Sequence, residues 1–234
     1  MTGTAYGMGV GPGDPELITL KAHRILRACP VVAYPAPDDG DSLTREIVAP
    51  HLPGGQTEIA IRIPMVSERF PAQAIYDQAA ADIGAHLESG RDTAILCEGD
   101  PFLYGSFMYL FARLAERFPV EVIPGVSSLT ACAATLGAPL AARNDVLMVI
   151  PAPLDADQLA SRLASADAAA IIKIGRHLDK VRGVLDTLGL AAHARYVEHA
   201  TMANQRVIPL ADVDAETAPY FSMILVHKRG QAWQ

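Results

Sequence analysis

Short apolar runs alternate with longer stretches of helical periodicity along the first half of the chain. Apolar runs bounded by turn residues predict buried strands, and helices between such strands predict parallel pairing. The predicted strands of this half are residues 5–10, 31–34, 58–63, 93–97 and 120–123. The predicted helices are residues 15–28, 42–48, 72–88 and 104–117. We therefore expect a mostly parallel five-stranded sheet covered by helices.

The alternation continues beyond residue 124 and then changes character. Helices are expected at 128–136, 156–164 and 177–188, with strands at 146–150 and 169–174. The last apolar segments, 195–199, 206–209 and 220–227, follow one another without helices, which predicts antiparallel pairs in a mixed second sheet. The pattern thus predicts two α/β domains, residues 1–120 and 121–234.

Composition and charge narrow the class of protein. Half of the 234 residues are hydrophobic and 19% are charged, which is typical of a globular chain with a substantial core. Residues 1–6 lack the features of a signal peptide, and no apolar stretch reaches membrane-spanning length. A net charge of −7 without a basic tract disfavours nucleic-acid binding, which depends on phosphate neutralisation. We expect a cytoplasmic protein that binds neither membranes nor nucleic acid.

Cysteine and histidine spacing gives no sign of a metal centre. Cys29, Cys97 and Cys132 are odd in number and far apart, which fits neither a disulfide framework nor a zinc site. His193 and His199 are too loosely spaced for a metal pair, and no H-x-x-x-H pattern is present. We expect the cysteines to pack in the core and expect no protein-bound metal.

The first glycine-rich loop, residues 7–14, lies at the end of the first predicted strand. It does not match the dinucleotide fingerprint G-x-G-x-x-G in either alignment. If the motif starts at Gly7, its third glycine is replaced by Pro12, and if it starts at Gly9, by Asp14. No Gly-Lys-Ser/Thr follows, so a Walker A loop is also excluded. The glycines are expected to allow a tight turn and close approach of a ligand. Asp14 is the expected N-cap of the following helix, with Pro15 as its first residue.

Two further loops follow predicted strands and precede predicted helices. One is residues 98–106, Glu-Gly-Asp-Pro-Phe-Leu-Tyr-Gly-Ser, and the other is residues 124–128, Pro-Gly-Val-Ser-Ser. Helix capping by Asp100 or by the serine hydroxyls would explain each loop alone. In a parallel sheet, however, all three loops converge on the rim where open α/β sheets bind small molecules.

Taken in order along the chain, these segments resemble the motifs of the tetrapyrrole (corrin/porphyrin) methylases. Residues 9–22, Gly-Val-Gly-Pro-Gly-Asp-Pro-Glu-Leu-Ile-Thr-Leu-Lys-Ala, look like the opening signature of that family. Residues 98–101 resemble its G-D-P loop, and residues 124–128 its P-G-V/I-S/T segment. Residues 198–205, Glu-His-Ala-Thr-Met-Ala-Asn-Gln, resemble its late cofactor segment. The resemblance spans nearly the whole chain and is more specific than any single glycine loop.

The resemblance implies two α/β domains with S-adenosylmethionine in the cleft between them, and usually a homodimer. Many contacts would be made by backbone atoms, because the cofactor's carboxylate suits N–H groups at a helix start. Its ammonium suits carbonyl groups or Asp100. The cofactor contacts implied by the resemblance are Pro12, Gly99, Asp100, Leu103, Ser127, Ser128, Ile174, Ala200 and Thr201.

Within the family, the resemblance is greatest to the precorrin-2 C20-methyltransferases. Residues 31–35, Val-Val-Ala-Tyr-Pro, resemble the end of their second strand, and residues 137–142 resemble their G-A-P-L-A-A segment. Residues 172–177 resemble their lysine-containing strand end. Uroporphyrinogen-III methylases generally carry a proton-accepting aspartate where this chain has Pro35, which argues against that activity. The resemblance therefore implies methyl transfer to C20 of precorrin-2, giving precorrin-3A, in cobalamin (corrinoid) biosynthesis.

Substrate contacts follow from the chemistry of this tetrapyrrole. Precorrin-2 is a polycarboxylate, so a chain of net charge −7 must offer it local cations. The candidates are Arg62, Arg143 and Arg176 for the carboxylates, Tyr34 beside the substrate, and Met65 and Phe70 for an apolar floor. No catalytic base is assigned, because a phenol with a pKa of about 10 accepts protons poorly at neutral pH.

Three other functions remain open. Methylation at C11 or C17, or a cobalt-containing substrate, would preserve every cofactor motif. A nicotinamide-dependent oxidoreductase would need an intact G-x-G-x-x-G and an acidic residue after the second strand, where this chain has Tyr34 and Pro35. A noncatalytic corrinoid-binding protein would need no methyl donor, so cofactor binding would argue against it.

Overall fold

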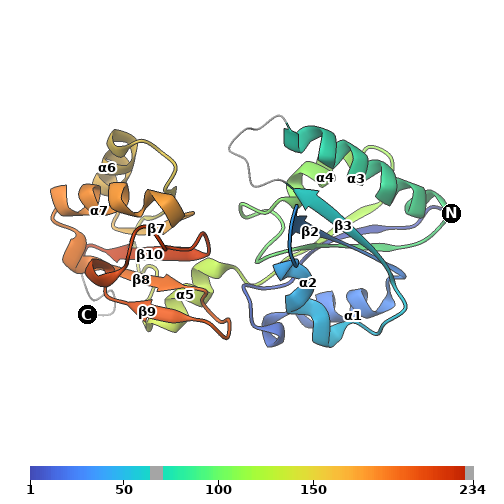
Figure 1. Cartoon of the computed structure of the whole chain (residues 1–234), viewed down its shortest axis with the longest axis horizontal. Coiled ribbons are helices and arrows are strands. Elements are labelled where there is room, and N and C mark those ends of the chain that lie inside the picture. Colours follow the sequence, from blue (N-terminus) through green and yellow to red (C-terminus); the bar gives the residue numbers. More distant parts are fainter. Residues whose placement is uncertain (64–70, 230–234) are drawn as a thin grey trace. The chain divides into compact units, whose positions relative to one another are not determined.

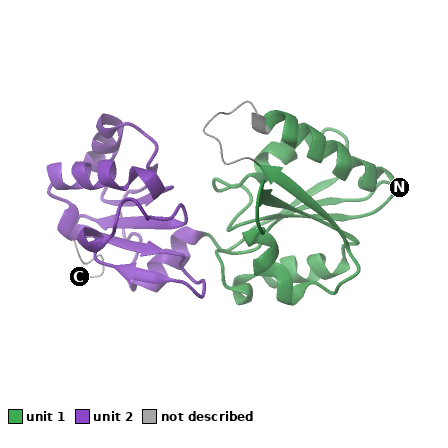
Figure 2. Cartoon of the chain, viewed as in Figure 1, with its two compact units in different colours: residues 1–127 green, residues 128–234 purple. Residues whose placement is uncertain are grey.

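The chain divides into two compact units, Met1–Ser127 and Ser128–Gln234 (Figure 2). The structure is a computed structural model that describes residues 1–63 and 71–229. Each unit contains one five-stranded sheet with its own helices (Figure 1). None of the helices in these two ranges combines the length and the apolarity needed to cross a membrane.

The first unit is built on a parallel sheet, which confirms the prediction from alternating apolar runs and helices. Its strands are β1 (Ala5–Gly9), β2 (Val31–Pro37), β3 (Thr57–Ile63), β4 (Thr93–Cys97) and β5 (Val120–Ile123). Their order is β3-β2-β4-β1-β5, and every neighbouring pair is parallel. Because β5 pairs with β1, it belongs to the first unit, and the unit ends at Ser127 instead of residue 120.

Helices cover both faces of this sheet because its central strands are apolar on both. The helices are α1 (Leu20–Ala28), α2 (Leu43–Val48), α3 (Pro71–Glu88) and α4 (Phe107–Leu114). In β4, Ala94 and Leu96 pack against α1 and α2, whereas Ile95 and Cys97 pack against α3 and α4. Burial raises the pKa of the Cys97 thiol to about 11, so this cysteine is a protonated packing residue, as expected.

Two helix starts in this unit differ from prediction where the backbone turns. Residues 15–28 form a short 3₁₀ helix, Pro15–Leu17, followed by α1. Asp14 caps the 3₁₀ helix and Thr19 caps α1, each by accepting a backbone N–H, so Asp14 is not the N-cap of α1. Helix α4 begins three residues later than predicted because Tyr104 has a φ of 56°, outside the helical region.

The second unit holds a mixed sheet, which confirms the antiparallel pairing expected after residue 188. Its strands are β6 (Leu147–Pro151), β7 (Ala168–Ile172), β8 (Ala194–Glu198), β9 (Arg206–Ile208) and β10 (Ser222–His227). The order is β6-β7-β10-β8-β9, in which only β6 and β7 are parallel. Because β10 runs antiparallel between β7 and β8, it begins at the edge where those two strands end.

Helices also cover both faces of the second sheet. The helices are α5 (Ser128–Leu136), α6 (Ala156–Ser165) and α7 (Leu178–Thr187). Alternate residues of β10 divide between the faces: Ile224 packs with α6 and α7, and Met223 packs with α5. The strand is therefore buried at every position, and its four middle residues are apolar, as expected for a central strand.

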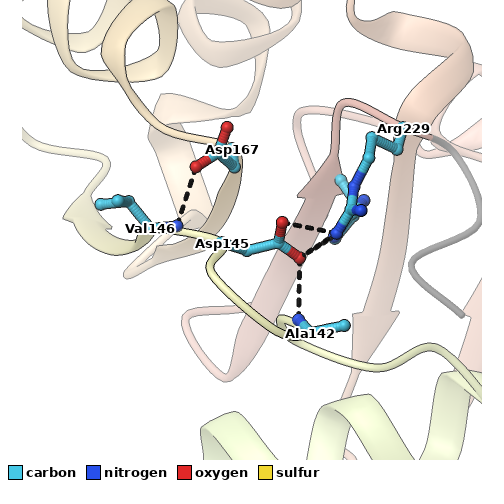
Figure 3. Close-up of polar contacts among 6 residues, drawn as sticks. Ala142, Asp145, Val146, Asp167 and Arg229 are labelled. Carbon is cyan, nitrogen blue, oxygen red and sulfur yellow. Dashed lines mark hydrogen bonds and ion pairs between the residues drawn. The ribbon is translucent and has the colours of Figure 1, made fainter.

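A charged cluster fixes the chain where it enters β6 (Figure 3). Asp145 Oδ2 accepts the N–H of Ala142 at 2.8 Å and lies 3.1 Å from His227 Nε2. Both carboxylate oxygens lie 2.5 Å from Nη2 of Arg229. The Ala142 N–H above all, then His227 and Arg229, lower the pKa of the Asp145 carboxyl to about 2. Since β6 and β7 begin here and β10 ends here, the cluster marks the amino edge of the parallel pair.

Replacing Asp145 by Asn tests this cluster. Because the folded-state pKa lies below the unfolded value of about 3.9, the carboxylate stabilises the fold above about pH 4. That stabilisation is lost as the pH falls toward about 2. We expect Asp145→Asn to lower the thermal midpoint at neutral pH, and the difference from wild type to shrink between about pH 4 and about pH 2. A difference independent of pH over this range would contradict the role of the charge.

Candidate cofactor site

The three glycine-rich loops lie side by side at the carboxyl edge of the first sheet, as parallel pairing predicts. Strand β1 lies between β4 and β5, so the loops that follow these three strands are neighbours. The N–H of Gly99 donates to the carbonyl of Gly11 at 2.8 Å, and the N–H of Gly11 donates back to the Gly99 carbonyl at 3.4 Å. The loops after β1 and β4 are thus joined through backbone atoms alone.

Asp100 joins the loop after β4 to the loop after β5. Its Oδ2 accepts the N–H of Gly125 at 3.0 Å. Its Oδ1 accepts the N–H groups of Phe102 and Leu103 at 2.9 and 3.2 Å. These charge-assisted bonds occupy three of the roughly four lone-pair directions of a carboxylate. About one direction remains for the ammonium group that is predicted to bind there.

Glycine is required where these loops approach one another. A Cβ atom at Gly125 would lie 2.0 Å from the carbonyl oxygen of Gly99, and one at Gly9 would lie 2.3 Å from the same oxygen. Both distances are far inside van der Waals contact, so no side chain fits at either position. The main chains of the three loops therefore pack directly against one another, which only glycine allows at these two positions.

The other predicted cofactor residues of the first unit lie on the same three loops. Pro12 is buried in the loop after β1, and Leu103 is 40% exposed in the loop after β4. Ser127 ends the loop after β5, directly before Ser128, the first residue of α5. Tyr104 holds a left-handed backbone conformation beside Leu103. Residues held in the left-handed region are concentrated at ligand-binding sites.

In the second unit, the predicted cofactor residues gather at the edge where β7 and β8 end. Ile174 lies two residues beyond β7 and is fully buried. Ala200 and Thr201 lie shortly after β8. The start of β10 reaches the same edge, because the N–H of His199 donates to the carbonyl of Phe221 at 2.8 Å. The mixed sheet thus brings Ile174, Ala200 and Thr201 together, and their contact with a cofactor stays a prediction.

The loop between β8 and β9, residues 199–205, contains two residues in the left-handed region. The φ of His199 is 49° and that of Thr201 is 71°. A β-branched residue in this region is strained by about 1–3 kcal/mol and persists only where other contacts hold it. The N–H of Thr201 donates to Oε1 of Gln205 at 2.7 Å. Gln205 is absent from the predicted site residues, although an amide four residues after Thr201 is a local signal for such a bond.

Ala200 offers two backbone groups at this edge. Its side chain packs against α5 beside Cys132, and the residue is 8% exposed. Within residues 1–63 and 71–229, the N–H and C=O of Ala200 take part in no hydrogen bond. Because backbone polar groups at low exposure are rarely left unpaired, these two groups are suited to a ligand.

Tyr34 lies in a hydrogen-bonded group on the face of the first sheet that α1 and α2 cover. Its hydroxyl donates to Oε2 of Glu58 at 2.8 Å, and Arg45 binds both oxygens of Glu58 at 3.0 and 3.1 Å. Burial above all, and then the bond to Glu58, raise the pKa of the Tyr34 phenol. Strand β2 continues to Pro37, and Glu58 pairs with Val32, two residues before Tyr34. The hydroxyl therefore points away from the loop edge, and a substrate contact of Tyr34 stays a prediction.

Two of the predicted arginines lie at carboxyl edges. Arg62 is near the end of β3, and its guanidinium donates to the carbonyl of Pro37 at 2.7 Å. Arg176 lies two residues beyond Ile174, at the edge where β7 ends. Both side chains are exposed, so each is accessible to an anionic ligand.

Arg143, the third predicted arginine, lies at an amino edge. Arg143 lies two residues before Asp145, at the amino edge of β6, so the second sheet separates it from Thr201. The sequence already indicates this separation, because Arg143 precedes the predicted strand 146–150 whereas the cofactor residues follow predicted strands. Met65 and Phe70 lie outside the described residues.

The chain is similar in sequence to known proteins over most of its length. The sequence profile of the tetrapyrrole (corrin/porphyrin) methylases matches residues 4–214. The chain belongs to this family. Membership in the tetrapyrrole methylases confirms the resemblance carried by the G-D-P loop and the other motifs, and the match covers most of both units.

Three relatives match nearly the whole of this chain. The cobalamin biosynthesis protein CobIJ of Mycobacterium tuberculosis is 43% identical over 96% of this chain, which spans about half of that protein, 46% of its length. The precorrin-2 C(20)-methyltransferase of a Sinorhizobium species is 40% identical over 96% of this chain and 95% of its own. The cobalt-precorrin-2 C(20)-methyltransferase of Salmonella typhimurium is 32% identical over 98% of each chain.

A solved structure of the family shares the fold. The uroporphyrin-III C-methyl transferase from Thermus thermophilus, complexed with S-adenyl homocysteine, matches with a TM-score of 0.70 and 26% sequence identity. The match covers 97% of this chain and 92% of that one. The parallel first sheet and the mixed second sheet are therefore the architecture of a tetrapyrrole methyltransferase.

Replacing Gly125 by Ala tests the close packing of the three loops. The added methyl group would overlap the carbonyl oxygen of Gly99, so we expect the free energy of unfolding to fall by about 2–3 kcal/mol. Gly183→Ala is the matched control, because Gly183 is exposed within α7 and has no atom within 4 Å of its Cβ position. That variant should gain up to about 1 kcal/mol in urea unfolding. Equal stability of the two variants would contradict the observed packing.

Proposed function

We propose that this protein is an S-adenosylmethionine-dependent methyltransferase that methylates C20 of precorrin-2 and gives precorrin-3A in cobalamin biosynthesis. The observation that carries the proposal is the 40% identity to the precorrin-2 C(20)-methyltransferase of Sinorhizobium, which extends over nearly all of both chains. The Tyr34-Pro35 pair and residues 137–142, which resemble the C20 branch of the family, support the same regiochemistry.

The loop edges fit the polar groups of S-adenosylmethionine. When bound, this cofactor supplies a methyl group on a sulfonium, which a carbon nucleophile displaces. Backbone N–H groups around Ser127 and Ser128, at the start of α5, suit its carboxylate. Asp100 and nearby carbonyls suit its ammonium. The open N–H and C=O of Ala200 suit the edge of adenine, which offers both acceptors and a donor.

Methylation of C20 depends on the orientation of the reacting groups more than on acid–base catalysis. The new bond joins the methyl carbon to C20, and the proton of C20 leaves to a base or to water. Correct alignment of the reacting groups supplies roughly 7–11 kcal/mol of barrier reduction in well-oriented reactions. Tyr34 does not take up the proton at neutral pH, since its pKa is raised by burial, so no residue is assigned as base.

Local cations would hold the carboxylates of the substrate. The net charge of −7 opposes attraction of a polyanion by the protein as a whole. Arg62 and Arg176 are the proposed partners because both are exposed at carboxyl edges. Arg143, at the opposite edge of the second sheet, does not share this position.

A cobalt-containing precorrin-2 is the second candidate substrate. The 32% identity to the cobalt-precorrin-2 C(20)-methyltransferase of Salmonella typhimurium over 98% of both chains favours it. The higher identity to the metal-free C20 enzyme of Sinorhizobium makes precorrin-2 the first choice. Both substrates call for the same methyl transfer at C20.

The proposal extends to a cytoplasmic homodimer. Light scattering would test the dimer by measuring the mass of the protein in solution. All three cysteines are buried free thiols, which fits a reducing compartment. Exposed apolar side chains around the start of α4 form a surface that a second copy would cover. These side chains are Phe102, Tyr104, Met108 and Tyr109.

Incubation of the protein with precorrin-2 and a carbon-13 methyl donor tests the function directly. We expect one labelled methyl at C20 and none at C11 or C17, observed by mass spectrometry and NMR of the macrocycle. Cobalt-precorrin-2 in a parallel reaction separates the two substrates. Label at another carbon would overturn the regiochemistry, and no transfer to either macrocycle would overturn the enzymatic assignment.

A further inference from the structure

One exposed side chain connects the β8–β9 loop to helix α5. Oε1 of Gln205 accepts the N–H of Thr201 at 2.7 Å and the hydroxyl of Thr135, on α5, at 3.2 Å. Helix α5 starts at Ser128, and the loop carries Ala200 and Thr201. A single amide oxygen thus joins the two elements of this unit that begin or contain predicted cofactor contacts.

We propose that Gln205 is a positioning residue of the cofactor site, which fixes the peptide between Ala200 and Thr201 for ligand binding. The assignment rests on the proposed function, since it presumes that this loop binds S-adenosylmethionine. It adds a residue that acts through the loop and itself touches no ligand.

The geometry of the peptide group explains how Gln205 would act on Ala200. The C=O of Ala200 and the N–H of Thr201 belong to the same planar trans peptide, so they point in opposite directions. Holding the N–H on Gln205 therefore fixes the direction of the Ala200 carbonyl. That carbonyl is the acceptor that makes no hydrogen bond within the described part of the chain.

Thr201 holds an unfavourable backbone conformation, and the Gln205 side chain accepts its N–H. Its φ of 71° is unfavourable for a β-branched residue, and relaxation to an extended conformation would rotate the preceding peptide. Two successive turns surround it, with Met202 N–H donating to His199 at 2.9 Å and Gln205 N–H donating to Met202 at 3.0 Å. These turns bond other amide groups and leave the Thr201 N–H to the Gln205 side chain.

Other contacts hold the hairpin itself. Arg206 pairs with the buried carboxylate of Glu198 at 2.9 Å across the base of the loop, and Ala200 packs its side chain against α5. Gln205 is exposed and contributes nothing to the core. Loss of its oxygen should therefore free one peptide without unfolding the unit.

Three variants separate positioning from folding. Gln205→Leu removes the acceptor, Gln205→Glu keeps an acceptor oxygen at the same reach, and Gln158→Leu is the matched control. Gln158 is exposed on α6, and its side chain makes no hydrogen bond to the described residues. Calorimetry with S-adenosylhomocysteine should give a Kd about 3–10-fold higher for Gln205→Leu. The other two variants should stay within about twofold of wild type, and all three should melt like wild type.

Amide hydrogen exchange in the ligand-free protein gives a second readout. The Thr201 amide should exchange faster in Gln205→Leu and remain protected in Gln205→Glu. Unchanged affinity and unchanged exchange in Gln205→Leu would overturn the role of Gln205 alone. Failure of wild-type protein to bind S-adenosylhomocysteine would overturn the proposed function and this assignment with it.

Discussion

The loop edge of the first sheet depends on the hydrogen bonds of one carboxylate. Strands that end in a parallel sheet leave backbone N–H groups without partners, and Asp100 accepts three of them from two different loops. Its bond to Gly125 holds the loop after β5 against the loop after β4. This contact and the Gly11–Gly99 pair hold the loops together, and the lack of side chains at Gly9 and Gly125 permits their close approach.

Each unit gathers strand ends at one edge of its sheet, but the two sheets have different topologies. In the first, parallel pairing places three strand ends together, and the absence of Cβ atoms lets the main chains of the loops pack closely. In the second, the reversed strand β10 brings its own start to the ends of β7 and β8, and the loop after β8 carries His199 and Thr201 in the left-handed region. Main-chain groups suit a methyl transfer that requires a well-oriented sulfonium and little acid–base chemistry.

The sequence predicts the elements well because apolar periodicity records burial on both faces of each sheet. The parallel and mixed sheets, and the convergence of the three loops, follow from that pattern. Thr19 as the cap of α1 and the late start of α4 could not be predicted, because the backbone turns that cause them leave no periodic signal. The orientation of Tyr34 toward Glu58 depends on a contact between two strands that the sequence pattern does not specify.

The proposed role of the Asp100 carboxylate is to shape the cofactor site by joining two loops. Asp100→Asn is nearly isosteric and keeps Oδ1, but it places an amide nitrogen where Oδ2 accepts the Gly125 N–H, so two donors face each other. Calorimetric titration with S-adenosylhomocysteine should show affinity lowered by about tenfold or more, with a much smaller change in thermal midpoint. Affinity within about twofold of wild type in a folded variant would contradict this role.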